Sequence, residues 1–224
     1  MQLMARVKLT DEQISEFKQQ LVTAATRLFV KNGYAGVTMR AIAKKLKCSP
    51  MKAYRYFGDK DEIFMMVRTA AYLSFAESQQ KAYFSKTSAL ERLVEIGVAY
   101  FQYARENPLQ YRLMFEFFQP DPVTYPQLRE AENESMKPLH TVVVELINQG
   151  TFKAAPDPDI QTHVIWSAVH GVVSLGLTGK LSKHVDPADV EQAVRNVLFL
   201  GLAIPEGQTE RMTALEHDYA AKAD

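Results

Sequence analysis

Two short helical patterns, separated by a turn of about two residues, constrain the fold of this chain more than any other feature. Thr38 can cap the first, and the apolar residues of 39–46 recur at i, i+3, i+4 and i+7, on one helical face. Ser49 can cap the second, and Pro50 suits its first position, where the backbone N–H has no helical partner. Gly58 ends the second pattern. The spacing is that of a helix-turn-helix.

Helical patterns also cover the rest of the chain. A first helix starts at a cap on Thr10 or Asp11 and ends at Asn32-Gly33, and a fourth starts at a cap on Asp59. No stretch has sustained period-2 alternation, so we expect an all-α fold. After Pro205 we expect a weakly held helix or disorder. The remaining helices are predicted between proline-containing breaks, over 88–106, 108–118, 125–149, 157–179 and 187–203.

Charge is divided unevenly along the 224 residues. The net charge is zero, but residues 1–58 carry 11 Lys/Arg against 3 Asp/Glu, and residues 59–224 carry 15 against 23. A basic segment followed by an acidic body indicates that the first part meets a polyanion. A helix-turn-helix fits this, because its first helix braces the second against the DNA major groove. A helical hairpin in an ordinary bundle is the alternative.

The run from Leu21 to Val67 resembles the N-terminal domain of TetR/AcrR-type transcriptional regulators. The shared features are F-x-x-x-G-Y from Phe29, Thr38 followed by I-A-x-x-L, and S-x-x-x-x-Y-x-Y-F-x-x-K from Ser49. The resemblance implies a three-helix DNA-binding domain at 1–58 and a helical bundle for ligand binding and dimerisation at 59–224. In the turn and the following helix, the chain departs from the family at Lys47, Cys48, Met51 and Ala53. Met51 lies where the family reads bases, so this departure bears on which operator sequence is recognised.

The resemblance, together with the chemistry of DNA contacts, assigns roles to nine residues. Arg40 is expected at a guanine edge, the commonest specific contact. Pro50, Met51 and Lys52, at the start of the helix after Ser49, are expected to face bases. Phosphates are expected to be held by Thr38, Tyr54, Tyr56 and Lys60, and by the backbone amides at the starts of the helices. The predicted DNA-binding residues are Thr38, Arg40, Ser49, Pro50, Met51, Lys52, Tyr54, Tyr56 and Lys60.

The last two long helices predict a homodimer. The stretch from Val164 to Leu177 is apolar almost all round, and residues 187–203 carry a wide apolar stripe. In TetR-like proteins this pair forms a four-helix interface with its symmetry mate, which implies a near-palindromic operator. Trp166 to Gly171 also resembles the W-x-x-x-H-G signature of the WHG-type C-terminal domain.

A small, largely apolar effector is expected inside residues 85–180. Aromatic side chains are dense over 100–118, near the helix that carries Trp166 and His170. Such rings can line an apolar cavity, while a histidine or an indole N–H fixes orientation. Packing in the core is the alternative. The predicted ligand-binding residues are Phe101, Phe115, Trp166 and His170.

Other chemistry has weaker support. His163 and His170 lack the i, i+4 spacing and the third ligand of a metal site, and Cys48 is the only cysteine, so we expect no metal and no cofactor. No signal peptide or bilayer-spanning stretch is visible, which predicts a cytoplasmic protein with no membrane partner. The leading expectation is a ligand-responsive repressor. The alternatives are a helical-bundle enzyme acting on a hydrophobic small molecule and an interaction module that binds no DNA.

Overall fold

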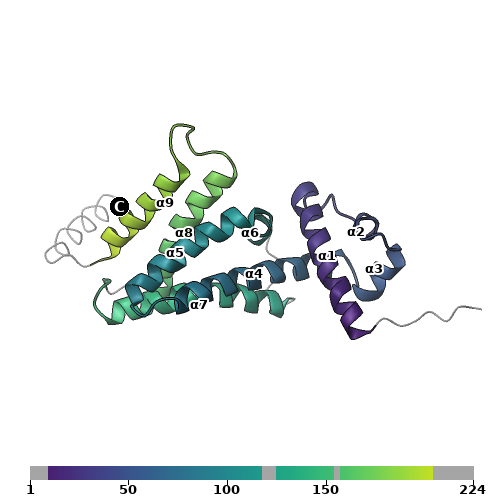
Figure 1. Ribbon diagram of the computed structural model, residues 1–224, viewed down its shortest axis with the longest axis horizontal. Helices are drawn as coiled ribbons and strands as arrows, with labels where there is room; N and C mark the ends of the chain where they lie inside the picture. The colour runs from purple at the N-terminus through teal and green to yellow at the C-terminus, as the bar shows by residue number, and fades with distance from the viewer. Residues whose placement is uncertain (1–9, 118–124, 154–156, 204–224) are drawn as a thin grey trace, which may run out of the picture. The chain divides into compact units, whose positions relative to one another are not determined.

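The computed structural model describes residues 10–117, 125–153 and 157–203, where every regular element is a helix (Figure 1). This confirms the all-α prediction. The predicted tail after Pro205 lies outside the described residues. Within those ranges the helices are α1 (Asp11–Asn32), α2 (Met39–Lys45), α3 (Pro50–Tyr56), α4 (Lys60–Phe84), α5 (Ala89–Glu106), α6 (Pro108–Phe115), α7 (Pro126–Asn148), α8 (Pro158–Leu177) and α9 (Pro187–Leu202).

Local signals account for the helix starts. The side chain of Thr10 accepts the backbone N–H of Gln13, whose own side chain accepts the N–H of Thr10, a reciprocal capping box. Helices α6 to α9 each begin with a proline, a residue whose fixed φ suits the first helical turn. The predicted helix over 108–118 is too long: α6 ends at Phe115.

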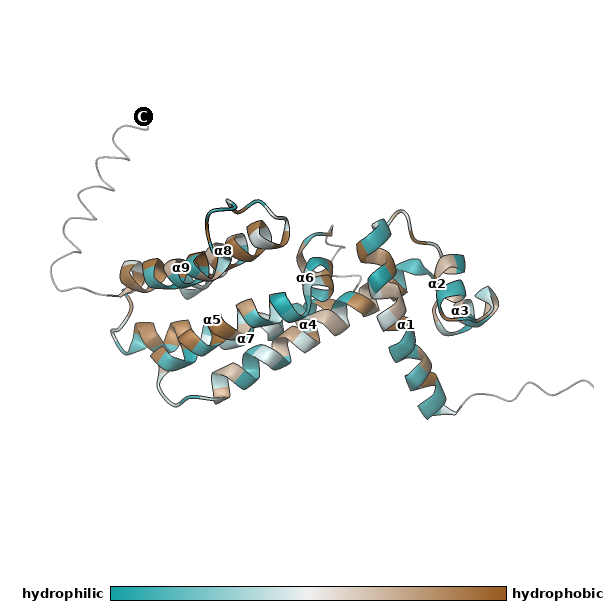
Figure 2. Ribbon diagram, turned by 45° about the horizontal axis from the view of Figure 1, so that its top comes forward, coloured by the Kyte–Doolittle hydropathy of each residue, from teal (hydrophilic) through white to brown (hydrophobic). Residues whose placement is uncertain are grey.

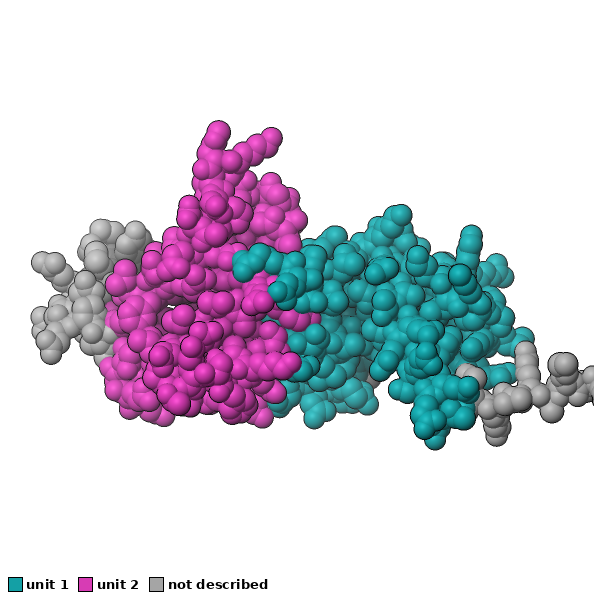
Figure 3. Space-filling view, viewed as in Figure 1, with its two compact units in different colours: residues 1–77, 105–135 teal, residues 78–104, 136–224 magenta. Residues whose placement is uncertain are grey.

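Packing divides the chain into two compact units, coloured separately in Figure 3. Unit 1 comprises residues 1–77 and 105–135, and unit 2 comprises residues 78–104 and 136–224. The boundaries fall inside α4, α5 and α7. The predicted boundary at residue 58 separates DNA binding from ligand binding and dimerisation, and it stays a prediction.

In unit 1, α1 packs against α2 and α6, and α2 packs against α3. The core centres on α1, where Leu21 and Phe29 have no exposed surface. Burying each of these side chains stabilises the fold by about 1.5–3 kcal/mol. The ring of Phe29 meets that of Phe64 from α4 edge-on, at 4.8 Å between centroids. The start of α4 is thereby tied to the helix that supports α2 and α3.

A buried arginine joins α4 to the end of α6. Arg68 has no exposed surface, and its Nε and Nη2 donate to the carbonyls of Leu113 and Met114 at 3.0 and 3.1 Å. The hydroxyl of Tyr72 donates to the same Met114 carbonyl at 3.0 Å. The last carbonyls of a helix have no partner within that helix, so these donors satisfy the C-terminus of α6. Burial lowers the pKa of Arg68, while electrostatic attraction to Tyr72 and Glu132 acts in the opposite direction.

Unit 2 has its own apolar core, drawn from α5, α7, α8 and the segment after α7. Val142, Val143 and Leu146 of α7 are almost completely buried there, and α8 packs against α9. The remaining buried members of this cluster are Ala89, Ile96, Phe152 and Ile165. This core therefore holds α5, α7 and α8 together within unit 2.

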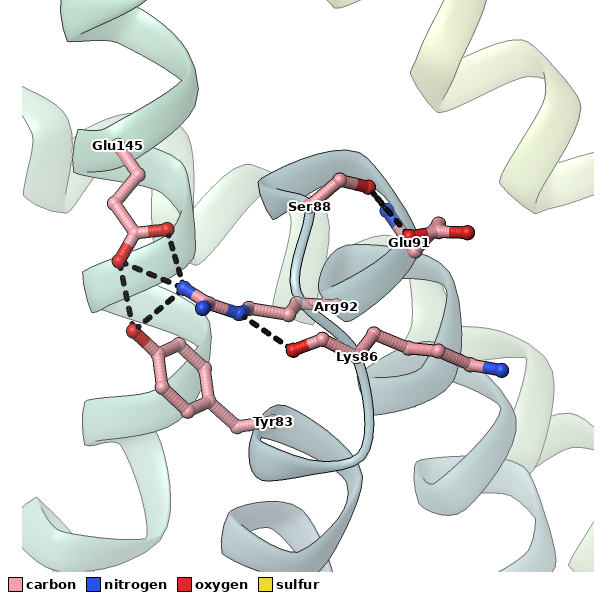
Figure 4. Close-up of polar contacts among 6 residues, drawn as sticks. All are labelled: Tyr83, Lys86, Ser88, Glu91, Arg92 and Glu145. Atoms are coloured by element: carbon pink, nitrogen blue, oxygen red, sulfur yellow. Dashed lines mark hydrogen bonds and ion pairs between the residues drawn. The ribbon is translucent and has the colours of Figure 1, made fainter.

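A polar network closes one edge of unit 2 (Figure 4). The hydroxyl of Tyr83 donates to Glu145 at 2.7 Å, and Arg92 Nη1 donates to the same carboxylate at 2.9 and 3.2 Å. Arg92 Nε also donates to the carbonyl of Lys86 at 3.1 Å. Hydrogen bonding to Glu145 raises the pKa of Tyr83. Helices α4, α5 and α7 are thus joined by charge-assisted hydrogen bonds.

Candidate nucleic-acid interface and effector site

The three helix starts around the motif are built by side-chain caps. Thr38 Oγ1 accepts the N–H of Ala41 at 3.2 Å, and Ser49 Oγ accepts the N–H of Lys52 at 3.2 Å. Asp59 accepts the N–H of Glu62 at 2.8 Å at the start of α4. The predicted caps at Thr38, Ser49 and Asp59 are confirmed.

The turn between α2 and α3 holds a residue in the left-handed region. Lys47 has a φ of 52°, and no other non-glycine residue in the described part of the chain has a positive φ. This conformation is costly for a residue with a Cβ, whereas glycine adopts it readily. The N–H of Cys48 donates to the carbonyl of Ala43 at 3.0 Å and closes the turn.

The outer surface of α2 and α3 carries several of the predicted DNA-binding residues. Arg40 on α2 is exposed, as is Pro50 at the start of α3. Met51 and Tyr54 are 66% and 54% exposed. We call Arg40, Pro50, Met51 and Tyr54 the outer face. Arg55, which is also exposed on α3, was not among the predicted site residues, although an arginine on a motif helix is itself a signal.

Two other predicted residues of α3 pack against α1. Lys52 Nζ lies 4.5 Å from the ring centroid of Phe17, a cation–π geometry, and the ring of Tyr56 lies 5.5 Å from the same ring. Both side chains are half-buried, while Ala53 between them is fully buried. This side of α3 therefore anchors the helix.

Lys60 is held by the loop between α1 and α2. Its Nζ donates to the carbonyl of Tyr34 at 3.0 Å and lies 3.9 Å from the centroid of the Tyr34 ring. The side chain is half-buried. Lys60 thus ties the start of α4 to this loop, 26 residues earlier in the chain.

In unit 2, Tyr100 brings two of the predicted ligand-binding residues together. Trp166 Nε1 donates to the Tyr100 hydroxyl at 3.2 Å, and that hydroxyl lies 3.4 Å from His170 Nδ1. Burial lowers the pKa of His170, which favours a neutral imidazole. Tyr100 itself was missed as a site residue, because nothing local links it to residues 66 and 70 positions later. We call Tyr100, Trp166 and His170 the aromatic triad.

The two predicted phenylalanines lie in different units. Phe101 in unit 2 is 1% exposed, and Arg195 of α9 lies 5.6 Å from its ring centroid. Phe115 in unit 1 packs against Tyr111 and Tyr72, at 4.8 and 5.9 Å between centroids. Phe101 therefore shares a unit with the aromatic triad, whereas Phe115 packs among unit 1 rings.

Helices α8 and α9 leave large aliphatic side chains exposed, and the ribbons of both helices carry brown, hydrophobic segments in Figure 2. On α9, Val197 and Leu200 are 68% and 69% exposed; on α8, Ile160 and Val164 are 61% and 50% exposed. Gly201 is also exposed, and a Cβ there would meet nothing within 4 Å. We call this surface the α8–α9 apolar face.

Among the described residues, no three His, Cys, Asp or Glu side chains are grouped so as to hold a metal ion. No helix in those ranges is both long enough and apolar enough to cross a membrane.

Comparison with known proteins identifies the two parts of the chain. Residues 21–66 match the family described as bacterial regulatory proteins, tetR family. Residues 93–199 match the tetracyclin repressor-like C-terminal domain. Membership of the WHG group stays a prediction.

Individual relatives agree with these matches. The transcriptional regulator HbdR of Aromatoleum sp. strain CIB is 32% identical over 87 residues, or 39% of this chain, which spans only 38% of HbdR. The transcriptional activator FasR of Mycolicibacterium smegmatis is 25% identical over 162 residues, or 72% of this chain and 69% of FasR.

A solved structure supports the fold over most of the chain. FadR of Bacillus subtilis, solved in complex with stearoyl-CoA, has a TM-score of 0.70 at 19% identity and covers 82% of this chain and 98% of its own. A structural similarity at 19% sequence identity establishes the fold alone. With both parts of the chain matched and the helix-turn-helix built as described, the chain belongs to the TetR family of bacterial transcriptional regulators.

Proposed function

We propose that the protein is a ligand-responsive repressor that binds a near-palindromic operator as a homodimer and releases it when a small, largely apolar effector binds. The observation that carries this proposal is the division of α3 into two sides. Lys52 and Tyr56 anchor one side to α1, while the outer face leaves Met51 and Tyr54 open to a partner.

On the outer face, Arg40 is proposed to read a guanine, with Pro50 and Met51 against neighbouring bases. Tyr54 and the capped starts of α2 and α3, at Thr38 and Ser49, are proposed to hold phosphates. Exposed Arg55 joins this set.

Lys52, Tyr56 and Lys60 complete the proposed interface from its edge. Each is half-buried and already contacts an aromatic ring within the chain. The DNA contact proposed for each must therefore be possible while that ring contact is kept. A lysine that stacks on a ring keeps N–H groups for a phosphate oxygen. We therefore assign these three residues to backbone positioning, with less influence on which sequence is chosen.

The proposed dimer uses the α8–α9 apolar face. Aliphatic side chains more than half exposed, such as Val197 and Leu200, gain about 25 cal/mol per Å² when they are covered. A two-fold contact places two copies of the outer face on one DNA, which is why the operator is expected to be a near-palindrome.

The proposed effector site lies in unit 2 beside the aromatic triad. A neutral His170 and the Tyr100 hydroxyl supply hydrogen bonds, and Phe101 supplies an apolar neighbour in the same unit. That FadR of Bacillus subtilis was solved with stearoyl-CoA supports an effector with an apolar chain and a polar group. The effector weakens DNA binding only if it binds the DNA-free form more tightly than the DNA-bound form.

The test joins two readouts in one titration. Trp166 is the only tryptophan, so its fluorescence reports compounds that bind near the triad. A panel of fatty acids, acyl conjugates and hydrophobic drugs is scored for quenching and for release of labelled operator. We expect the compounds that quench also to release DNA. If every quenching compound leaves operator affinity unchanged, the regulatory role is wrong even where DNA binding holds.

A further inference from the structure

Unit 1 contains a hollow of about 240 Å³ between α1, α4 and α6. Three small residues, Ala70, Ala71 and Ser74, lie on its α4 side within five positions of each other. Larger side chains there would fill the space between the three helices. Since α1 also packs against α2, the hollow adjoins the helix that supports the DNA-binding motif.

The interior walls of the hollow are mainly aliphatic. Val22 comes from α1, Val67 from α4 and Leu109 from α6, and Val67 is 1% exposed. The volume of about 240 Å³ has room for the body of a small organic molecule.

Polar side chains line the hollow from all three helices, including Ser74 on α4 and Thr26 on α1. Arg27 and Thr23 of α1 and Gln110 of α6 line it, and none of its lining residues, all of them described, is acidic. The Thr23 hydroxyl donates to the carbonyl of Gln19 at 3.2 Å, so its remaining capacity is as an acceptor. The guanidinium of Arg27 is therefore the group that sets the charge of a complementary ligand.

We propose that this hollow binds a small organic carboxylate, with the apolar body between Val67, Ala70 and Leu109 and the carboxylate on Arg27. A guanidinium and a carboxylate form charge-assisted, often bidentate hydrogen bonds, so a neutral or cationic molecule of the same shape binds more weakly. The site belongs entirely to unit 1, whereas the aromatic triad belongs to unit 2. It requires neither DNA binding nor the effector site proposed above.

The experiment follows side-chain methyl groups in the full chain by NMR during titration with sodium hexanoate, hexanamide and hexylamine. We expect hexanoate to shift the methyl signals of Val22, Val67, Ala70 and Leu109 to saturation. Signals near Trp166 should stay unchanged at the same concentrations. Hexanamide and hexylamine should bind less tightly than hexanoate.

Arg27→Gln should weaken hexanoate binding by at least about fivefold, the scale of one charge-assisted hydrogen bond partly open to solvent. It should leave hexanamide binding unchanged. The matched control is Lys31→Gln, which removes a cation one turn further along α1, outside the hollow. Lys31→Gln should leave hexanoate binding as it is.

Ala70→Leu should fill the hollow and abolish binding of both hexanoate and hexanamide. If thermal melting shows that Ala70→Leu does not fold, Ser74→Leu fills the same space from an exposed position. The proposal is overturned if hexanoate causes no saturable shift, or if its shifts gather in unit 2. It is also overturned if Arg27→Gln and Lys31→Gln bind hexanoate equally well.

Discussion

The outer face of α2 and α3 and the apolar face of α8 and α9 are both exposed, but they differ in chemistry. The first mixes a guanidinium, a thioether and a phenol, on Arg40, Met51 and Tyr54. The second presents aliphatic side chains, with Val197 and Leu200 about two-thirds exposed. A cationic and mixed surface suits a polyanion with base edges, whereas an aliphatic surface gains free energy only when another apolar surface covers it.

The difference separates two proposed partners of one chain. Where charge and hydrogen-bonding groups are exposed, we propose DNA; where aliphatic groups are exposed, we propose a second copy. Substitutions on one surface should therefore change sequence preference, and substitutions on the other should change oligomeric state.

The largest effect is expected for Leu200→Glu on α9. Placing a charge in the proposed dimer contact should give a monomer and lower affinity for the full operator by about 1000-fold, since linked sites commonly gain 10²–10⁴ in avidity. Light scattering and gel shifts measure the two effects. Ala188→Glu adds the same charge to the first turn of α9 and should do neither. A monomer with undiminished operator affinity would refute the proposed dimer.

Arg68→Met tests the buried counterpart of the exposed Arg40. Methionine keeps much of the side-chain length but donates to neither carbonyl: Leu113 loses the arginine hydrogen bond, and Met114 keeps only the one from Tyr72. We therefore expect a loss of about 3 kcal/mol in the free energy of unfolding. Urea unfolding measures it. The exposed Arg40→Met should change stability by less than about 0.5 kcal/mol. Equal stability of the two variants would show that the Arg68 contacts add nothing net.

Arg40→Ala tests base reading on the outer face. We expect a loss of about 1–3 kcal/mol in operator binding and a relaxed preference at one base position. Competition gel shifts against operators altered at each position measure both. Lys183→Ala, which removes an exposed cation in the loop before α9, is the matched control. A uniform loss over all sequences would move Arg40 from base reading to phosphate binding.

The smallest effect is expected for Lys60→Gln. Losing one phosphate contact should weaken binding to all sequences alike and lower the slope of log affinity against log salt by about one. Because Lys60 also holds Tyr34, stability should fall by about 1 kcal/mol. Salt titrations and urea unfolding separate the two roles. A stability loss with an unchanged salt slope would make Lys60 structural alone.

Sequence reasoning succeeded where the cause is local. The side chains of Thr38, Ser49 and Asp59 act on backbone groups three residues away, so a short window contains both partners. The prediction of one helix over 125–149 is also confirmed, since α7 continues through Pro138 without a break.

It failed where the partner is distant in sequence. The early end of α6 coincides with Arg68, 45 residues earlier, which takes the carbonyl that continued helix would use. Lys60 on Tyr34 and Tyr100 between Trp166 and His170 are likewise tertiary contacts without a local pattern. The outer face itself was only partly resolved from sequence, since Lys52 and Tyr54 differ in exposure although both are polar residues of α3.

Selection of bound DNA from a random pool by the purified protein, followed by sequencing, tests the central claim most directly. The account predicts one enriched near-palindrome with two half-sites related by two-fold symmetry, whose centres are about one helical turn, 10 to 10.5 base pairs, or a multiple of it apart. The same selection with Leu200→Glu should yield single half-sites. No enrichment, or one asymmetric site bound equally by the protein and by Leu200→Glu, would contradict the account.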